Sequence, residues 1–301
     1  MSHLKIKEAV FEELLETLIK INTSEVEMES CIFFKCSSSG KGTCIYADSS
    51  AVSVSSSCFE LTGPRDILET GCTLFSTSSD TTISTVSILM CPYTDKESRL
   101  DSLYLIYGTS SISNLNSSQN TNAQSACVQL TKMDAETVIS FLLAADGRGL
   151  DTVELQGISA GRNCHFRRSA FVNNTVSLFL LYFLSSSASM SLDEVVISGN
   201  SNTVLNSNNV VFSDCTYFGT PSLGISDQNP NGLKMTDSGF ITHVSYKFST
   251  NGCHGKMSRP SVIVSSRIKA IIAFLLNFYF SYLIQFLPLA VTEQNNIRLY
   301  F

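Results

Sequence analysis

The feature that most constrains the fold is a series of short β-rich runs from about Asn22 to about Lys256, separated by breaks rich in Ser, Asn and Gly. Strands this short cannot bury their apolar faces alone, whereas coils stacked on one another share a continuous core. The pattern therefore predicts a mainly β fold over residues 22–255, best matched by a parallel β-helix.

Cysteines recur in a similar context within these runs. A small or polar residue precedes Cys, and a bulky apolar residue follows about two places later, in segments that begin at Ser30, Ser57, Gly71, Asn163 and Asp214. Because side chains alternate between the faces of a strand, both residues share one face. The 22 residues between Cys36 and Cys58 suggest the length of one coil. We expect the inward residues to include Phe33, Ile45, Val54, Phe166, Leu180, Ile197 and Val211.

Residues 1–21 show a different periodicity. Apolar residues from Val10 to Ile19 recur at three- and four-residue spacing, and the glutamates lie largely off that stripe. This pattern predicts an amphipathic helix over residues 4–20 that caps the first coil against edge pairing. The alternative is an ordinary surface helix on another β fold.

A long apolar segment lies near the end of the sequence. Ile271 to Val291 reads IIAFLLNFYFSYLIQFLPLAV and contains no charged residue. At about 1.5 Å per residue, such a helix crosses a hydrocarbon core of ~30 Å. We therefore predict a transmembrane helix over residues 270–291, between a basic linker at 256–269 and a short tail at 292–301, with the lipid bilayer as a partner. A buried terminal helix is the alternative.

Composition narrows the function classes. A net charge of −6 and scattered basic residues argue against a nucleic-acid partner. The ten cysteines form no Cys-x-x-Cys pair, so zinc-finger and redox interpretations lack their main signal. The cysteines are better explained as small buried hydrophobic residues, with some disulfides if the domain is extracellular.

Residues 31–47 carry a family resemblance. A CIFFKC strand from Cys31 to Cys36 leads through a Ser/Gly-rich corner into GTCIY from Gly42 to Tyr46. This run resembles a motif of right-handed β-helix surface proteins, in which a Cys-x-Phe-x-x-Cys strand precedes a Gly-Gly-Ala-Ile-Tyr strand. That family resembles the polymorphic outer membrane proteins of bacteria, and large sets occur in parasitic protists such as trichomonads. The resemblance implies a pectate-lyase-like superhelix with a surface, host-contact or adhesion role, and no catalytic residue.

Polysaccharide lyases and hydrolases share the β-helix fold, so a carbohydrate-active enzyme is the alternative function. Such enzymes bring acidic residues together beside Lys, Arg or His. The sequence has no Asp-Asp pair, and Asp146, Arg148 and Asp151 read as a Gly-bearing turn. In a strand, only one of Asp193 and Glu194 faces a given site. Three or more charged groups converging in a groove would favour the enzyme.

Other chemical motifs are incomplete. Gly157 to Gly161 matches the Gly-x-Ser-x-Gly elbow around Ser159, but a corner and a strand are expected to follow instead of the required helix. Gly40 to Thr43 lacks the remaining P-loop residues. Cys164-His165 and Cys253-His254 each place their two side chains on opposite faces of a strand, and a zinc site would need both pairs to converge. We therefore predict no catalytic, cofactor-binding or metal-binding residue, and hence no enzyme.

Three N-glycosylation sequons begin at Asn22, Asn116 and Asn173, and they matter only if the domain enters the secretory pathway. Two features disagree on this point. The family resemblance predicts a cell-surface domain. In contrast, the N-terminal residues do not form a signal peptide, and Lys and Arg cluster before the apolar segment, which predicts a tail-anchored domain facing the cytosol. In both cases we expect a membrane-attached, non-catalytic interaction or adhesion module with an unknown protein or glycan ligand.

Overall fold

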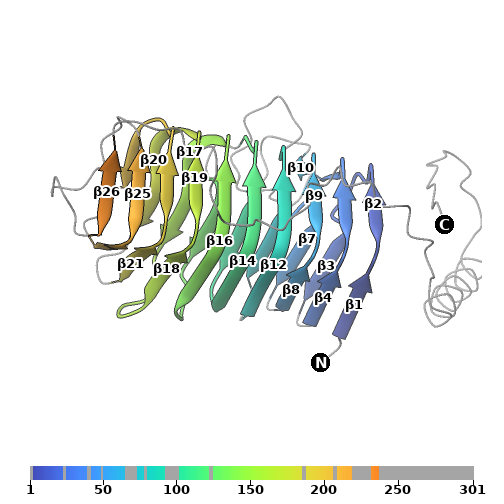
Figure 1. Cartoon of the computed structure of the whole chain (residues 1–301). Coiled ribbons are helices and arrows are strands. Elements are labelled where there is room, and N and C mark those ends of the chain that lie inside the picture. Colours follow the sequence, from blue (N-terminus) through green and yellow to red (C-terminus); the bar gives the residue numbers. More distant parts are fainter. Residues whose placement is uncertain are drawn as a thin grey trace, which may run out of the picture. The chain divides into compact units, whose positions relative to one another are not determined.

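The computed structural model describes residues 3–22, 25–38, 42–48, 50–64, 73–77, 80–91, 102–121, 125–184, 188–205, 209–218 and 232–236. These residues form 26 strands, and no helix occurs among them. The strands pair in parallel with the equivalent strands of neighbouring coils, so they lie side by side along one axis (Figure 1). This arrangement confirms the predicted parallel β-solenoid.

A 16-stranded sheet forms two flanks of the solenoid. The first flank contains β1 (His3–Lys7), β4 (Glu25–Glu29), β8 (Ala51–Ser55), β12 (Asp80–Leu89), β14 (Thr109–Ser118), β16 (Thr137–Ala145), β18 (Asn163–Arg167), β21 (Ser189–Asp193) and β24 (Val210–Ser213). The second flank contains β2 (Val10–Glu12), β5 (Ile32–Phe34), β9 (Cys58–Glu60), the second halves of β12, β14 and β16, then β19 (Ala170–Val172), β22 (Val196–Ser198), β25 (Cys215–Phe218) and β26 (Leu233–Thr236).

The remaining strands form two further sheets. An eight-stranded sheet contains β3 (Ile19–Asn22), β7 (Ile45–Asp48), β11 (Leu74–Thr77), β13 (Leu103–Ile106), β15 (Ser125–Thr131), β17 (Arg148–Gln156), β20 (Thr175–Leu184) and β23 (Thr203–Leu205). The short strands β6 (Ser37–Ser38) and β10 (Gly63–Pro64) form a separate pair at a corner. Each coil thus runs along the first flank, the second flank and the eight-stranded sheet.

Left-handed backbone at fixed places turns the chain between flanks. One such residue per coil lies between the first and second flanks, with φ between 47° and 57°: Glu8, Ser30, Ser56, Thr85, Asn114, Phe141, Arg168, Glu194 and Asp214. Another row follows the second flank: Glu13, Lys35, Leu61, Met90, Gln119, Asp146, Asn173 and Gly199. Because non-glycine residues rarely adopt this conformation, its repetition shows that the stack imposes the corner on varied side chains.

The core consists of columns of apolar side chains, one per coil. One column follows the strand register through Ile6, Met28, Val54, Ile83, Ile112, Ile139, Phe166, Leu192 and Phe212. In the second flank, the rings of Phe11, Phe33 and Phe59 stack with centroid separations of 4.8 and 4.6 Å. Each column buries apolar surface that a single coil would leave exposed.

The predicted N-terminal helix is wrong. Residues 3–22 form β1, β2 and β3, which are the three sides of a first coil, and left-handed corners at Glu8 and Glu13 separate them. Pairing with β4, β5 and β7 supplies these strands with backbone hydrogen-bond partners along one edge. The segment therefore belongs to the solenoid, and this segment is no helical cap.

The inward residues were predicted correctly with one exception. Phe33, Ile45, Val54, Phe166, Leu180 and Ile197 are at most 1% exposed, whereas Val211 is 62% exposed. The pairing of Phe212 with buried Leu192 turns Phe212 inward and Val211 outward. The inferred coil length was also wrong, since Cys58 pairs with Ile32, and register partners are 22 residues apart at Ile6 and 29 at Val54.

The buried location predicted for the cysteines is confirmed for the described ones. The free thiols are all buried and belong to Cys31, Cys36, Cys44, Cys91, Cys127, Cys164 and Cys215. Burial raises the pKa of Cys127 and of Cys164 to about 12, which keeps both thiols protonated at neutral pH. Cys58 is disulfide-bonded.

The described residues contain no helix that is long and apolar enough to span a bilayer. The predicted transmembrane segment, residues 270–291, lies outside the described residues.

Candidate functional site

A charged surface lies on the outer face of β16, β18 and β21. The strand register places Ser140 opposite Arg167 and Arg167 opposite Asp193. Side chains that share a register position on adjacent parallel strands point to the same face of the sheet. The row therefore presents a hydroxyl, a guanidinium and a carboxylate on three successive coils.

A second row follows the left-handed corner beside these strands. The guanidinium of Arg168 lies over the ring of Phe141, 5.9 Å from its centroid, and Arg168 Nε donates a hydrogen bond of 2.8 Å to Glu194 Oε2. The three residues occupy equivalent corners with φ values of 55°, 47° and 52°. Cation–π and charge-assisted contacts thus hold the Arg168 side chain in place.

The two rows enclose a shallow depression of about 350 Å³, which is lined by Val138, Ser140, Phe141, Arg167, Arg168 and Asp193. Beside it, the ring of His165 lies between Ser191 and Glu136, with one ring nitrogen hydrogen-bonded to each. The Arg167 guanidinium makes no ion pair with any described residue. The lining therefore offers cationic donors beside an aromatic ring, a combination suited to an anionic group on a partly apolar ligand.

The predicted charged candidates fall in different places. Asp193 lines the depression, while Glu194 sits at the corner and holds Arg168. This separation agrees with the expectation that only one of the two faces a site. Asp146 and Arg148 are exposed at a corner and at the start of β17. Asp151 is 4% exposed, and its burial raises the pKa of its carboxyl to about 7, with the Phe179 N–H opposing the rise and Glu154 adding to it.

The remaining motifs take structural positions. Ser159 lies in the corner between β17 and β18, and the strand β18 follows in place of the helix that a nucleophile elbow requires. Cys164 is buried, and His165 projects from the opposite face of β18, as expected. The described residues contain no group of three or more His, Cys, Asp or Glu placed to hold a metal ion. Gly40, Lys41, Cys253 and His254 lie outside the described residues.

The three sequon asparagines differ in exposure. Asn22 is exposed at the end of β3, and Asn173 is exposed at a corner between β19 and β20. Asn116 is half-buried within β14 and accepts a hydrogen bond of 2.5 Å from Ser118 Oγ. Glycosylation at these asparagines stays a prediction.

Sequence reasoning missed Arg167, Arg168 and Phe141. Their signal was positional: Phe141, Arg168 and Glu194 are separated by 27 and 26 residues, as are Ser140, Arg167 and Asp193. These separations are the local coil length, which brings the residues together across strands. The cysteine spacing had suggested a shorter coil and did not reveal the convergence.

Comparisons with protein-family models, with curated proteins and with solved structures found no match to this chain. Its class therefore rests on the structure itself, which is a parallel β-solenoid with a charged depression on its 16-stranded sheet.

Proposed function

We propose that this chain is a non-catalytic interaction module that binds an acidic glycan in the depression over β16, β18 and β21. The observation that carries the proposal is the placement of two guanidinium groups beside an aromatic ring. Arg167 and Arg168 supply donors for a carboxylate or sulfate, and Phe141 supplies an apolar face for a sugar ring. The adjoining Ser140 hydroxyl suits hydrogen bonding to sugar hydroxyl groups.

The arrangement of carboxylates supports binding over hydrolysis. Most glycoside hydrolases place two carboxyl groups across the scissile bond. Here Asp193 is the one carboxylate among the residues that line the depression, and neighbouring Glu194 holds Arg168 at the corner.

A carbohydrate-active enzyme is the second candidate, and one observation favours it. Arg167, Arg168 and Asp193 line one depression, which meets the criterion of three converging charged groups. Release of reducing sugar or of unsaturated ends from polygalacturonate, abolished by Asp193→Asn, would establish this enzyme in place of the non-catalytic module.

Binding is tested with immobilised acidic polysaccharides, such as polygalacturonate and a sulfated glycan, against a neutral glucan as a reference. We expect retention on the acidic polymers and at least a roughly tenfold loss of affinity in Arg167→Ala, since a charged hydrogen-bonded contact contributes on this scale. Arg148→Ala removes an exposed arginine outside the depression and serves as the matched control. Equal retention of the wild type and Arg167→Ala would contradict the proposal.

We also propose that residues 270–291 attach the module to a membrane, and that the solenoid is right-handed and related to the pectate-lyase-like surface proteins. The apolar segment and the CIFFKC…GTCIY run support these proposals. Parallel strand crossovers are right-handed in about 98% of cases, which supports the handedness. The resemblance favours the cell surface, and the charge pattern favours a cytosol-facing tail anchor. Protease protection of intact cells distinguishes the two.

A further inference from the structure

The first coil ends in an open strand edge. Among the described residues, β1 pairs only with β4, so the other edge of β1 lacks a described strand partner. An edge of this kind presents backbone N–H and C=O groups to any strand that adds to the sheet. Apolar side chains lie beside it, because Leu4, Val10 and Leu15 are 43%, 50% and 59% exposed.

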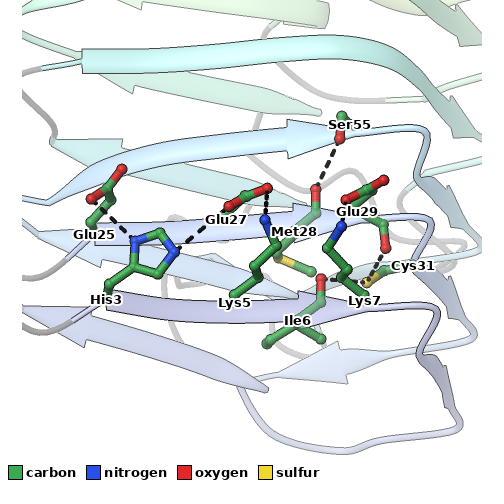
Figure 2. Close-up of polar contacts among 10 residues, drawn as sticks. All are labelled: His3, Lys5, Ile6, Lys7, Glu25, Glu27, Met28, Glu29, Cys31 and Ser55. Carbon is green, nitrogen blue, oxygen red and sulfur yellow. Dashed lines mark hydrogen bonds and ion pairs between the residues drawn. The ribbon is translucent and has the colours of Figure 1, made fainter. Parts of the chain in front are cut away.

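The outward side chains of β1 are all basic. His3, Lys5 and Lys7 alternate along the strand and meet glutamates at alternate positions on β4 (Figure 2). His3 Nδ1 lies 3.1 Å from Glu25 Oε2, Lys5 contacts Glu27, and Lys7 contacts Glu29. The inward residues, Leu4 and Ile6, pair with the buried Val26 and Met28.

This row of cations selects what the edge accepts. Pairing of β1 with β1 of a second copy would bring two rows of cations together, and like charges on facing strand positions are destabilising. Lysines on an edge strand also protect against unspecific pairing. An incoming strand with carboxylates at its outward positions meets the opposite condition, because each cation then lies between two rows of carboxylates.

We propose that the free edge of β1 binds an extended segment of a partner polypeptide by strand addition, and that this segment alternates acidic and apolar residues. The acidic residues would lie beside His3, Lys5 and Lys7, and the apolar residues would extend the column that contains Leu4 and Ile6. The segment from Glu25 to Glu29, with sequence EVEME, already satisfies this pattern on the other edge of β1. The partner is therefore recognised through its main chain and through alternate carboxylates.

The test uses the full chain in detergent micelles and two fluorescent peptides. The acidic peptide has the sequence of residues 23–31 with Cys31→Ser, and the basic peptide also carries lysine in place of each of its glutamates at 25, 27 and 29. Fluorescence anisotropy should show that the wild-type chain binds the acidic peptide at least roughly tenfold more tightly, since several ion pairs each contribute a few tenths of a kcal/mol or more.

A charge-swapped variant localises the binding to β1. The changes Lys5→Glu, Lys7→Glu, Glu27→Lys and Glu29→Lys preserve opposite charges between β1 and β4, so the coil retains its internal ion pairs while the edge changes sign. Circular dichroism and the melting temperature should match those of the wild type. The peptide preference should reverse, with the basic peptide now bound more tightly.

Other outcomes overturn the proposal. Equal binding of both peptides would show an apolar surface without charge selection. Unchanged preference in the charge-swapped variant would place the binding elsewhere on the chain. Absence of binding would leave the edge without this partner, and light scattering would then show whether a second copy occupies it. Binding only after removal of residues 268–301 would identify the chain's own segment as the occupant.

Discussion

At the residue scale, buried asparagines hold successive coils in register. Asn174 is 1% exposed, donates from Nδ2 to Ala144 O at 2.9 Å, and accepts from the Gly147 N–H at 3.0 Å. Asn200 repeats this role one coil further, since its Oδ1 accepts from the Asn174 N–H at 2.8 Å and its Nδ2 donates to Phe171 O. These amides satisfy corner backbone groups that lie away from water.

We expect Asn174→Ala to lower the free energy of unfolding by about 3 kcal/mol, because a buried N–H and a buried carbonyl each lose a partner. Urea denaturation monitored by circular dichroism measures the change. Asn116→Ala removes a half-buried asparagine within a strand and should cost less than about 1 kcal/mol. Similar losses in the two variants would show that the amide ladder contributes nothing specific.

Asp151 gives stability a pH dependence of defined sign. Burial raises the pKa of its carboxyl from 3.8 to about 7. The folded state therefore binds more protons than the unfolded state between pH 4 and pH 7, and stability from this group falls as pH rises through that window. Asp151→Asn should flatten this part of the curve of melting temperature against pH and raise the melting temperature at pH 8. A variant with the wild-type slope would contradict the assignment.

At the element scale, the failed helix prediction has a physical cause. Each left-handed corner interrupts the period-two alternation of a strand, so residues that pack against the core in the first coil are separated by three, two and three places at Ile6, Ala9, Phe11 and Leu14. This spacing imitates the stripe of an amphipathic helix. The strand type and the inward residues of isolated strands were predictable because no corner interrupts them. Coil length was not, because corners and loops vary from coil to coil.

The corner before β7 offers a test of how tightly an element is set by glycine. Gly42 has a φ of 68°, and an added Cβ would lie 2.2 Å from Ile45 O, a backbone atom. Gly161 has a φ of 71°, and an added Cβ would meet nothing within 4 Å. Gly161→Ala should therefore cost only the left-handed strain of about 1 kcal/mol.

Gly42→Ala adds a backbone clash to that strain and should lower the melting temperature by more than twice as much as Gly161→Ala. Differential scanning calorimetry of both variants measures the difference. Equal shifts would show that the chain around β7 moves aside readily.

At the scale of the whole molecule, stacking explains why fold and site differ in how far the sequence predicts them. The solenoid follows from local features, namely short strands, polar corners and apolar residues at alternate positions. The charged depression depends on which residue lies above which, and a change of one residue in a coil moves every side chain to the opposite face. Arg167 and Asp193 converge only because 26 residues separate them in a coil of that length.

The last prediction concerns residues 268–301. In a helix over 270–291, apolar side chains point in all directions around the axis, with Phe274, Leu275, Leu276 and Phe278 as an example. A helix docked on a solenoid should keep one polar face, whereas an all-apolar surface is stable in lipid and aggregates in water. Deleting residues 268–301 should convert a membrane-pelleted protein into a soluble one with the same far-ultraviolet β signal. If the shortened chain unfolds, or if the full chain is soluble without detergent, the segment packs within the protein and the membrane assignment is wrong.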